Sequence, residues 1–208
     1  MGLIPVKTPR FIKGMFPDYV WNMPLLDKKT IYLTFDDGPN PEITPWVLKT
    51  LKTYNAKATF FCIGDNVRKY PEVLKKTIDD GHAIGNHTFN HLKGWKTTSE
   101  AYIENVEKAA ESIPSKLFRP PYGKIKNKQA KILMQRGYRI IMWSIISFDW
   151  EKELLEADCL KNVIKNTQNG HIIVFHDSLK ASKNMQYVLP KVLEYFSKKG
   201  YDFKSLHF

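Results

Sequence analysis

The chain has 208 residues, 43% of them hydrophobic and 13% aromatic, a composition typical of one globular domain with a substantial core. Its formal net charge of +11 favours anionic partners, although lysines on solvated helix faces are the simpler explanation of that charge. Because the sequence contains no arginine-rich tract, zinc-finger spacing or aromatic RNA-binding motif, we expect no nucleic-acid partner.

The N-terminal stretch, residues 1–29, is rich in aromatic residues and prolines and is predicted to be an irregular arm packed on the domain. Its start contains no continuous apolar segment of the kind that a signal peptide needs, and no run in the chain reaches membrane-spanning length. We therefore expect no integral membrane segment and, as the sequence stands, a cytoplasmic location; we also expect a monomer. Residues 30–208 form the predicted domain.

From residue 30 onward, predicted strands and helices alternate. Strands are expected at 30–36, 58–64, 82–85, 116–119, 138–146, 171–176 and 201–203. Helices are expected from about residue 44, over 71–80, over 98–112 with Ser99 as a candidate cap, and over 127–136, 154–166 and 185–199. This alternation predicts right-handed βα units around a parallel sheet. About seven such units favour an α/β fold with a single, closed or nearly closed (β/α) barrel, whose chemistry gathers where the strands end.

The first predicted strand ends in two adjacent carboxylates, within Thr-Phe-Asp-Asp-Gly-Pro at 34–39. Side chains alternate between the faces of a strand, so Asp36 and Asp37 should diverge and could take different roles. Gly38-Pro39 then breaks the strand and leaves both acids at the mouth of the barrel. Taken alone, the hexapeptide is explained as well by an ordinary turn as by a site.

Two histidines follow the third predicted strand, in His-Thr-Phe-Asn-His at 87–91. If this segment is a helical turn, His87 and His91 can meet one ion from the same side. Together with Asp37 they would supply three ligands and leave positions open for water and substrate, as in catalytic zinc sites. A pair of surface or hydrogen-bonding histidines is the alternative.

Three further motifs follow later strands. In Arg119-Pro120-Pro121-Tyr122-Gly123 the two prolines make a rigid corner, Arg119 could pair with a carboxylate, and the Tyr122 amide could stabilise an oxyanion. A rigid turn without chemistry is the simpler interpretation of this motif.

Asp149 lies between aromatic residues at the end of the 138–146 region, and His176 ends the strand at 171–176. A histidine that leans on a carboxylate such as Asp149 would be a general acid with a tunable pKa.

The ordered series TFDDGP, HTFNH, RPPYG, DW and VFHD resembles the five motifs of the polysaccharide deacetylase (NodB-homology) domain, carbohydrate esterase family 4. The resemblance spans about residues 30–203. It implies a distorted (β/α) barrel and metal-dependent removal of N-acetyl, or O-acetyl, groups from a carbohydrate such as peptidoglycan, chitin-type oligosaccharide or exopolysaccharide. The substrates of relatives are largely extracytoplasmic.

Carried over by position, the resemblance makes Asp36 the catalytic base and Arg119 the residue that orients it and stabilises its charge. The metal ligands would be Asp37, His87 and His91. The ion would be one divalent metal, Zn²⁺ first, with Co²⁺ or Ni²⁺ suited to the same ligands.

The resemblance also makes His176 the general acid, tuned by Asp149, and gives the Tyr122 amide a place in the oxyanion hole. Residues that would contact the substrate are Trp150, Val174, Pro121 and Tyr122. Two departures are visible: Ile146 stands where many relatives carry an acid, and Val174 where leucine is common. The first leaves the central machinery intact and bears on the organisation of its loop and on substrate preference, and the second implies a slightly altered acetyl pocket.

Two other functions stay open at this stage. One is a deacylase of the same architecture that acts on a small non-sugar amide in a deep closed pocket. The other is a non-catalytic glycan-binding module whose basic face grips an acidic polymer, although the presence of every proposed catalytic residue argues against it.

Overall fold

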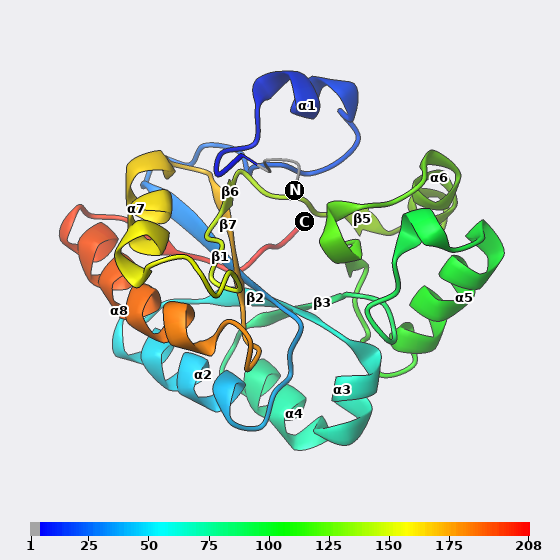
Figure 1. Ribbon diagram of the computed structural model, residues 1–208, viewed down its shortest axis with the longest axis horizontal. Helices are drawn as coiled ribbons and strands as arrows, with labels where there is room; N and C mark the ends of the chain where they lie inside the picture. Colours follow the sequence, from blue (N-terminus) through cyan, green and yellow to red (C-terminus); the bar gives the residue numbers. More distant parts are fainter. Residues whose placement is uncertain (1–4) are drawn as a thin grey trace.

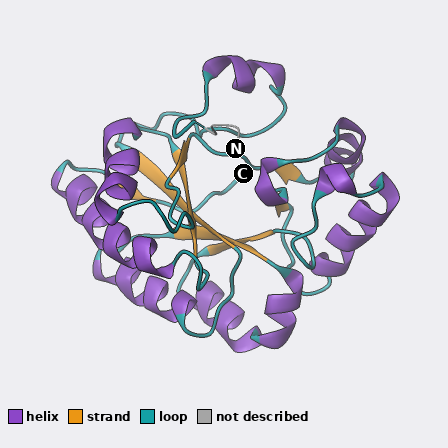
Figure 2. Cartoon of the chain, viewed as in Figure 1, coloured by secondary structure: helices purple, strands orange, loops and turns teal. Residues whose placement is uncertain are grey.

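A curled parallel β-sheet forms the centre of the molecule (Figures 1 and 2). The computed structural model describes residues 5–208 of the chain. The signal-peptide expectation falls partly on residues 1–4, outside the described residues. The strands are β1 (Thr30–Asp36), β2 (Ala58–Cys62), β3 (Ala83–Asn86), β4 (Leu117–Phe118), β5 (Arg139–Ile140), β6 (Ile145–Ile146), β7 (Ile172–His176) and β8 (Asp202–Phe203). Their order is β5-β4-β3-β2-β1-β7-β6, with β8 beside the start of β1. The predicted distorted (β/α) barrel is confirmed.

Most of the helices cover the outer side of the sheet, and the short one in the N-terminal arm lies apart from them (Figures 1 and 2). The helices are α1 (Arg10–Met15), α2 (Ile43–Thr53), α3 (Gly64–Lys69), α4 (Pro71–Asp79), α5 (Ser99–Ala110), α6 (Asn127–Gln135), α7 (Glu156–Asn166) and α8 (Ser182–Lys198). Within residues 5–208, none is long and apolar enough to cross a membrane. The prediction missed α3 and put the start of α8 three residues late. The cap of α5 is Thr98, whose hydroxyl accepts from the Ala101 amide, so the assignment to Ser99 was wrong.

The expected strand at 138–146 is two short strands, because its two ends belong to opposite edges of the sheet. β5 pairs with β4, whereas β6 pairs with β7. The segment between them crosses the open side of the barrel, where backbone groups of the N-terminal arm hydrogen-bond to it. Val20 accepts from the Met142 amide at 2.7 Å and Val6 from the Ile146 amide at 2.9 Å. The arm, predicted to be irregular, thus contains one helix, α1, and hydrogen-bonds to the segment that joins β5 to β6.

The central strand β1 is buried along its whole length and separates two environments. On the helix side, the Phe35 ring lies 5.0 Å from the Phe60 ring and 5.9 Å from the Phe175 ring, centre to centre. Because strand side chains alternate, Thr34 and Asp36 point into the barrel instead. The hydrophobic layer on one face of β1 therefore holds a carboxylate in place on the other.

Candidate active site

A buried ion pair occupies the carboxyl end of β1. Arg119 is fully buried and Asp36 is 4% exposed, and the Arg119 Nη1 donates to Asp36 Oδ1 at 2.8 Å. The same guanidinium donates to the Thr34 hydroxyl and to the carbonyls of Ile141 and Met142. Burial by itself would raise the pKa of Asp36, but the Arg119 charge, helped by its hydrogen bond and nearby histidines, lowers that pKa below its usual value. Asp36 is therefore an ionised, desolvated carboxylate.

Asp37, His87 and His91 form a cluster whose ligand atoms lie within 4.8 Å of one another. The Nε2 atoms of His87 and His91 lie 3.8 Å and 3.3 Å from Asp37 Oδ1, which is buried and has no hydrogen-bond partner among the described residues. One carboxylate and two imidazoles are a donor set that divalent metals such as zinc prefer. An orphaned, buried carboxylate oxygen between two imidazoles fits a metal site and is otherwise costly.

The ring orientations of both histidines support the same interpretation. His87 Nδ1 lies 2.7 Å from the Arg119 carbonyl, which can only accept, so Nδ1 carries the proton and Nε2 keeps its lone pair for the cluster. His91 Nδ1 lies 3.1 Å from the Tyr122 hydroxyl. Burial, together with the charge of His87, lowers the pKa of His91 to about 4, which keeps its ring neutral at neutral pH. Neutral imidazole is the form that binds metal.

The backbone that carries the two histidines is not the helical turn that their spacing suggested. Thr88 and His91 both have positive φ, 66° and 58°. Side chains hold the loop: the Thr88 amide donates to Asn86 Oδ1 at 2.8 Å and the Leu92 amide to the Thr88 hydroxyl at 3.0 Å. The histidines still meet, because the loop folds back on itself instead of winding into a helix.

His176, at the end of β7, leans on Asp149. Its Nδ1 lies 2.8 Å from Asp149 Oδ1, and its backbone amide donates to Oδ2 at 2.7 Å. The Trp150 ring packs edge-on against His176, with the ring centres 4.7 Å apart. Burial alone would lower the pKa of His176, but the charge and hydrogen bond of Asp149 outweigh it and raise the pKa to about 9. The histidine is therefore protonated at neutral pH, with Nε2 left for a group in the cavity.

These groups open into one cavity of about 390 Å³ at the carboxyl end of the sheet. Its lining includes the predicted Asp36, Asp37, His87, His91, Tyr122, Trp150, Val174 and His176. Pro121, expected to contact the substrate, is buried at the start of a tight turn and is not among the lining residues, whereas Pro120 is. Trp143, Lys124 and Lys180 also line the cavity but were not assigned a role from the sequence. Lys124 directly follows the RPPYG motif, so its proximity could have identified it, whereas Trp143 lies six residues before Asp149 and Lys180 three after Asp177.

A second buried acid, Asp177, supports the turn that carries Asp37. Its carboxylate accepts from the Gly38 amide at 3.0 Å and from the Thr44 hydroxyl at 2.5 Å. A Cβ at position 38 would lie 2.1 Å from Asp177 Oδ2, so only glycine permits this contact. Burial raises the pKa of Asp177 to about 7 even though the Thr44 hydrogen bond lowers it. The sequence placed Asp177 in the VFHD motif but gave the residue no role. Its hydrogen bond to the Gly38 amide joins the end of β7 to the turn that carries Asp37.

Comparison with known proteins identifies the same family that the sequence motifs resemble. Residues 25–141 match the family described as polysaccharide deacetylase. A peptidoglycan-N-acetylglucosamine deacetylase of Bacillus cereus is 37% identical over 191 residues, which cover 88% of each protein. A chitooligosaccharide deacetylase of Azorhizobium caulinodans is 36% identical over 158 residues, 73% of this chain and 75% of that protein.

Among solved structures, the Bc1960 peptidoglycan N-acetylglucosamine deacetylase superposes with a TM-score of 0.87 at 32% identity, covering 96% of this chain and 95% of that chain. The sequence match extends over more than half of the chain, and the structural match over nearly all of it. This chain therefore belongs to the polysaccharide deacetylase family, carbohydrate esterase family 4, a family of metal-dependent amide hydrolases that also includes a pseudoenzyme.

Proposed function

We propose that this chain removes the N-acetyl group from N-acetylglucosamine units of peptidoglycan. The observation that carries the proposal is the convergence of an ionised acid, a metal-type cluster and a protonated histidine on one cavity. The size of the cavity, about 390 Å³, suits a single sugar residue with its acetyl group. The similar proteins of Bacillus cereus and the similar solved structure are named for peptidoglycan, which supports that polymer as the substrate.

Asp37, His87 and His91 would hold the divalent metal, with zinc the first choice and cobalt or nickel suited to the same ligands. When bound, the metal supplies Lewis-acid polarisation of the acetyl carbonyl and lowers the pKa of a coordinated water. All remaining roles belong to side chains of this chain and to the Tyr122 backbone amide.

Asp36 is the proposed base. Its lowered pKa keeps it ionised, and Arg119 holds one of its oxygens while the residue lines the cavity. It would accept a proton from the attacking water. Arg119 is too well bonded to move, so its role is to fix the carboxylate and its charge.

His176 is the proposed general acid, positioned by Asp149. In its protonated form it would donate a proton from Nε2 to the sugar nitrogen as the amide breaks. Trp150, Ile146 and Val174 form the apolar wall beside it, where an acetyl methyl would lie. The Tyr122 amide, in a turn with φ of 60°, is proposed to stabilise the oxyanion.

The pH profile tests the His176 assignment. Because the acid must be protonated, we expect kcat/KM to fall above about pH 9, the raised pKa of His176. Asp149→Asn removes the charge that raises this pKa, so burial should dominate and move the alkaline limb down by about 1 to 3 pH units. Asp158→Asn, an exposed acid in α7, is the control and should keep the limb in place. An unshifted limb in Asp149→Asn would rule out His176 as the titrating acid.

The proposed function is tested by acetate release from purified glycan strands and from N-acetylated chitotetraose, with zinc, cobalt or nickel added. We expect metal-dependent release that chelation abolishes. Activity confined to a small non-sugar amide would favour the amide deacylase. Glycan binding without any acetate release under all three metals would favour the non-catalytic module.

A further inference from the structure

Exposed aromatic side chains and lysines alternate beside the catalytic cavity. Trp95, in the short turn η1 (Gly94–Lys96), is 60% exposed, and Tyr122, in the turn η2 (Pro121–Gly123), is 51% exposed. The Lys124 Nζ lies 5.1 Å from the Trp95 ring centre, and the Lys93 Nζ lies 4.9 Å from the Tyr122 ring centre. We call Lys93, Trp95, Tyr122 and Lys124 the lysine–aromatic rim.

The rim is held rigidly although its rings face solvent. Trp95 Nε1 donates to the Ile125 carbonyl at 3.1 Å, and Gln129 Nε2 donates to the Gly94 carbonyl at 3.0 Å. A Cβ at position 94 would lie 2.7 Å from the Lys124 carbonyl, so the two turns are packed backbone to backbone. An exposed tryptophan adds little to the core, whereas a ring fixed in advance lowers the entropy cost of binding.

The cavity also has an excess of positive charge at its edge. Lys124 and Lys180 both line the cavity, and Lys180 lies in the loop that follows His176 at the end of β7. Within residues 5–208, neither lysine forms an ion pair with an acid, so both ammonium groups are available to a ligand. Of the two acids that line the cavity, Asp36 pairs with Arg119 and Asp37 belongs to the proposed metal cluster.

We propose that the rim, with Lys180, recognises an acidic sugar next to the N-acetylated unit, a hexosamine that bears a carboxylate substituent. The solvent-exposed parts of the Trp95 and Tyr122 rings would pack on the apolar face of the sugar ring, and the lysine ammonium groups would pair with its carboxylate. Within the proposed function, this makes the enzyme selective for acidic glycans over neutral ones. The inference rests on the proposed function, because it names the substrate class of that same cavity.

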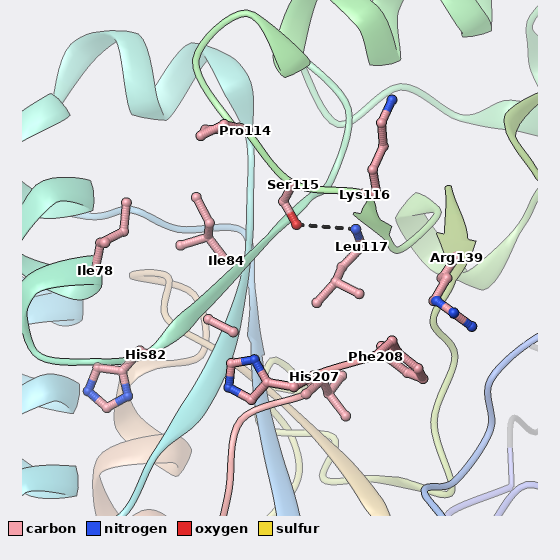
Figure 3. Close-up of a pocket in the computed structure, with 12 residues that line it drawn as sticks. Ile78, His82, Ile84, Pro114, Ser115, Lys116, Leu117, Arg139, His207 and Phe208 are labelled. Atoms are coloured by element: carbon pink, nitrogen blue, oxygen red, sulfur yellow. Dashed lines mark hydrogen bonds between the residues drawn. The ribbon is translucent and has the colours of Figure 1, made fainter. Parts of the chain in front are cut away.

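A cavity of about 500 Å³ at the other end of the strands provides a matched comparison (Figure 3). It has its own lysine over an aromatic ring, with Lys116 Nζ 4.5 Å from the Tyr138 ring centre. Its lining contains no carboxylate side chain, and the described residues place the Asp37 cluster at the opposite end. Lys116→Gln therefore removes the same kind of lysine from a place without catalytic groups.

The test compares kcat/KM for two substrates with the zinc-loaded enzyme. One is neutral N-acetylated chitotetraose, and the other is a tetrasaccharide of alternating N-acetylglucosamine and N-acetylmuramic acid with free lactyl carboxylates. We expect the acidic substrate to be favoured at low salt and to lose its advantage as ionic strength rises. Lys124→Gln and Lys180→Gln should each lower the acidic-to-neutral ratio about 2- to 5-fold, mainly through KM, and together about tenfold.

Two further variants complete the test. Trp95→Ala should lower kcat/KM for both substrates about fivefold, because ring stacking does not depend on the carboxylate. Lys116→Gln should leave both values unchanged. An acidic-to-neutral kcat/KM ratio near one in the parent enzyme would overturn the inference while the proposed function stands. The same holds if the Lys124→Gln, Lys180→Gln double variant does not lower that ratio. No acetate from either substrate would overturn the proposed function and the inference with it.

Discussion

Asp36→Asn is expected to reduce kcat about 10²- to 10⁴-fold while the protein stays folded and keeps its metal. Asparagine has nearly the same shape but cannot accept the proton of the attacking water. Arg119 retains three other acceptors, the Thr34 hydroxyl and the carbonyls of Ile141 and Met142, so the substitution leaves its charge solvated by the protein. The measurement is steady-state acetate release beside zinc content and thermal unfolding.

The control for this substitution is Asp27→Asn, which removes an exposed carboxylate of the N-terminal arm. It should match the parent protein in turnover, zinc content and unfolding temperature. Residual turnover in Asp36→Asn within tenfold of the parent, with the fold intact, would exclude Asp36 as the base. Loss of zinc together with activity would instead place Asp36 among the metal ligands.

His91→Ala is expected to abolish both metal retention and metal-dependent turnover. Among residues 5–208, His91 is one of three clustered ligands, and even the loss of a group that supports a ligand lowers metal affinity about 10- to 100-fold. A ligand that binds only the folded state stabilises it, by about 2.7 kcal/mol at a concentration 100 times its dissociation constant. Added zinc should therefore raise the unfolding temperature of the parent protein and leave that of His91→Ala unchanged.

His207→Ala is the matched control, because His207 is an exposed histidine at the opposite end of the barrel. It should retain the zinc content and the zinc-dependent rise in unfolding temperature. If His91→Ala binds zinc as tightly as this control, the cluster is not the metal site. Within the described part of the chain, the His91 side chain hydrogen-bonds the Tyr122 hydroxyl and no backbone group, and it is partly exposed, so the variant is expected to fold.

Helices and strands could be predicted from the sequence where burial requires apolar residues. β1, β2 and β7 are central strands covered on both faces, so they read as continuous apolar runs. The split at 138–146 was not predictable, because both halves are equally β-rich and only their partners, β4 and β7, separate them. The short helix α3 was missed since it has two buried residues and no apolar periodicity.

The sequence alone determined which chemical groups are present at the strand ends and in which order, and the family resemblance assigned each a role. Tertiary structure decided their geometry. The Asp36–Arg119 pair joins residues 83 positions apart, and the positive φ of Thr88 and His91 turns the two histidines toward Asp37. Local propensity does not encode such long-range distances, because barrel closure and side-chain hydrogen bonds set them. The lysines and rings beside the cavity became a candidate specificity surface only once two distant turns were packed together.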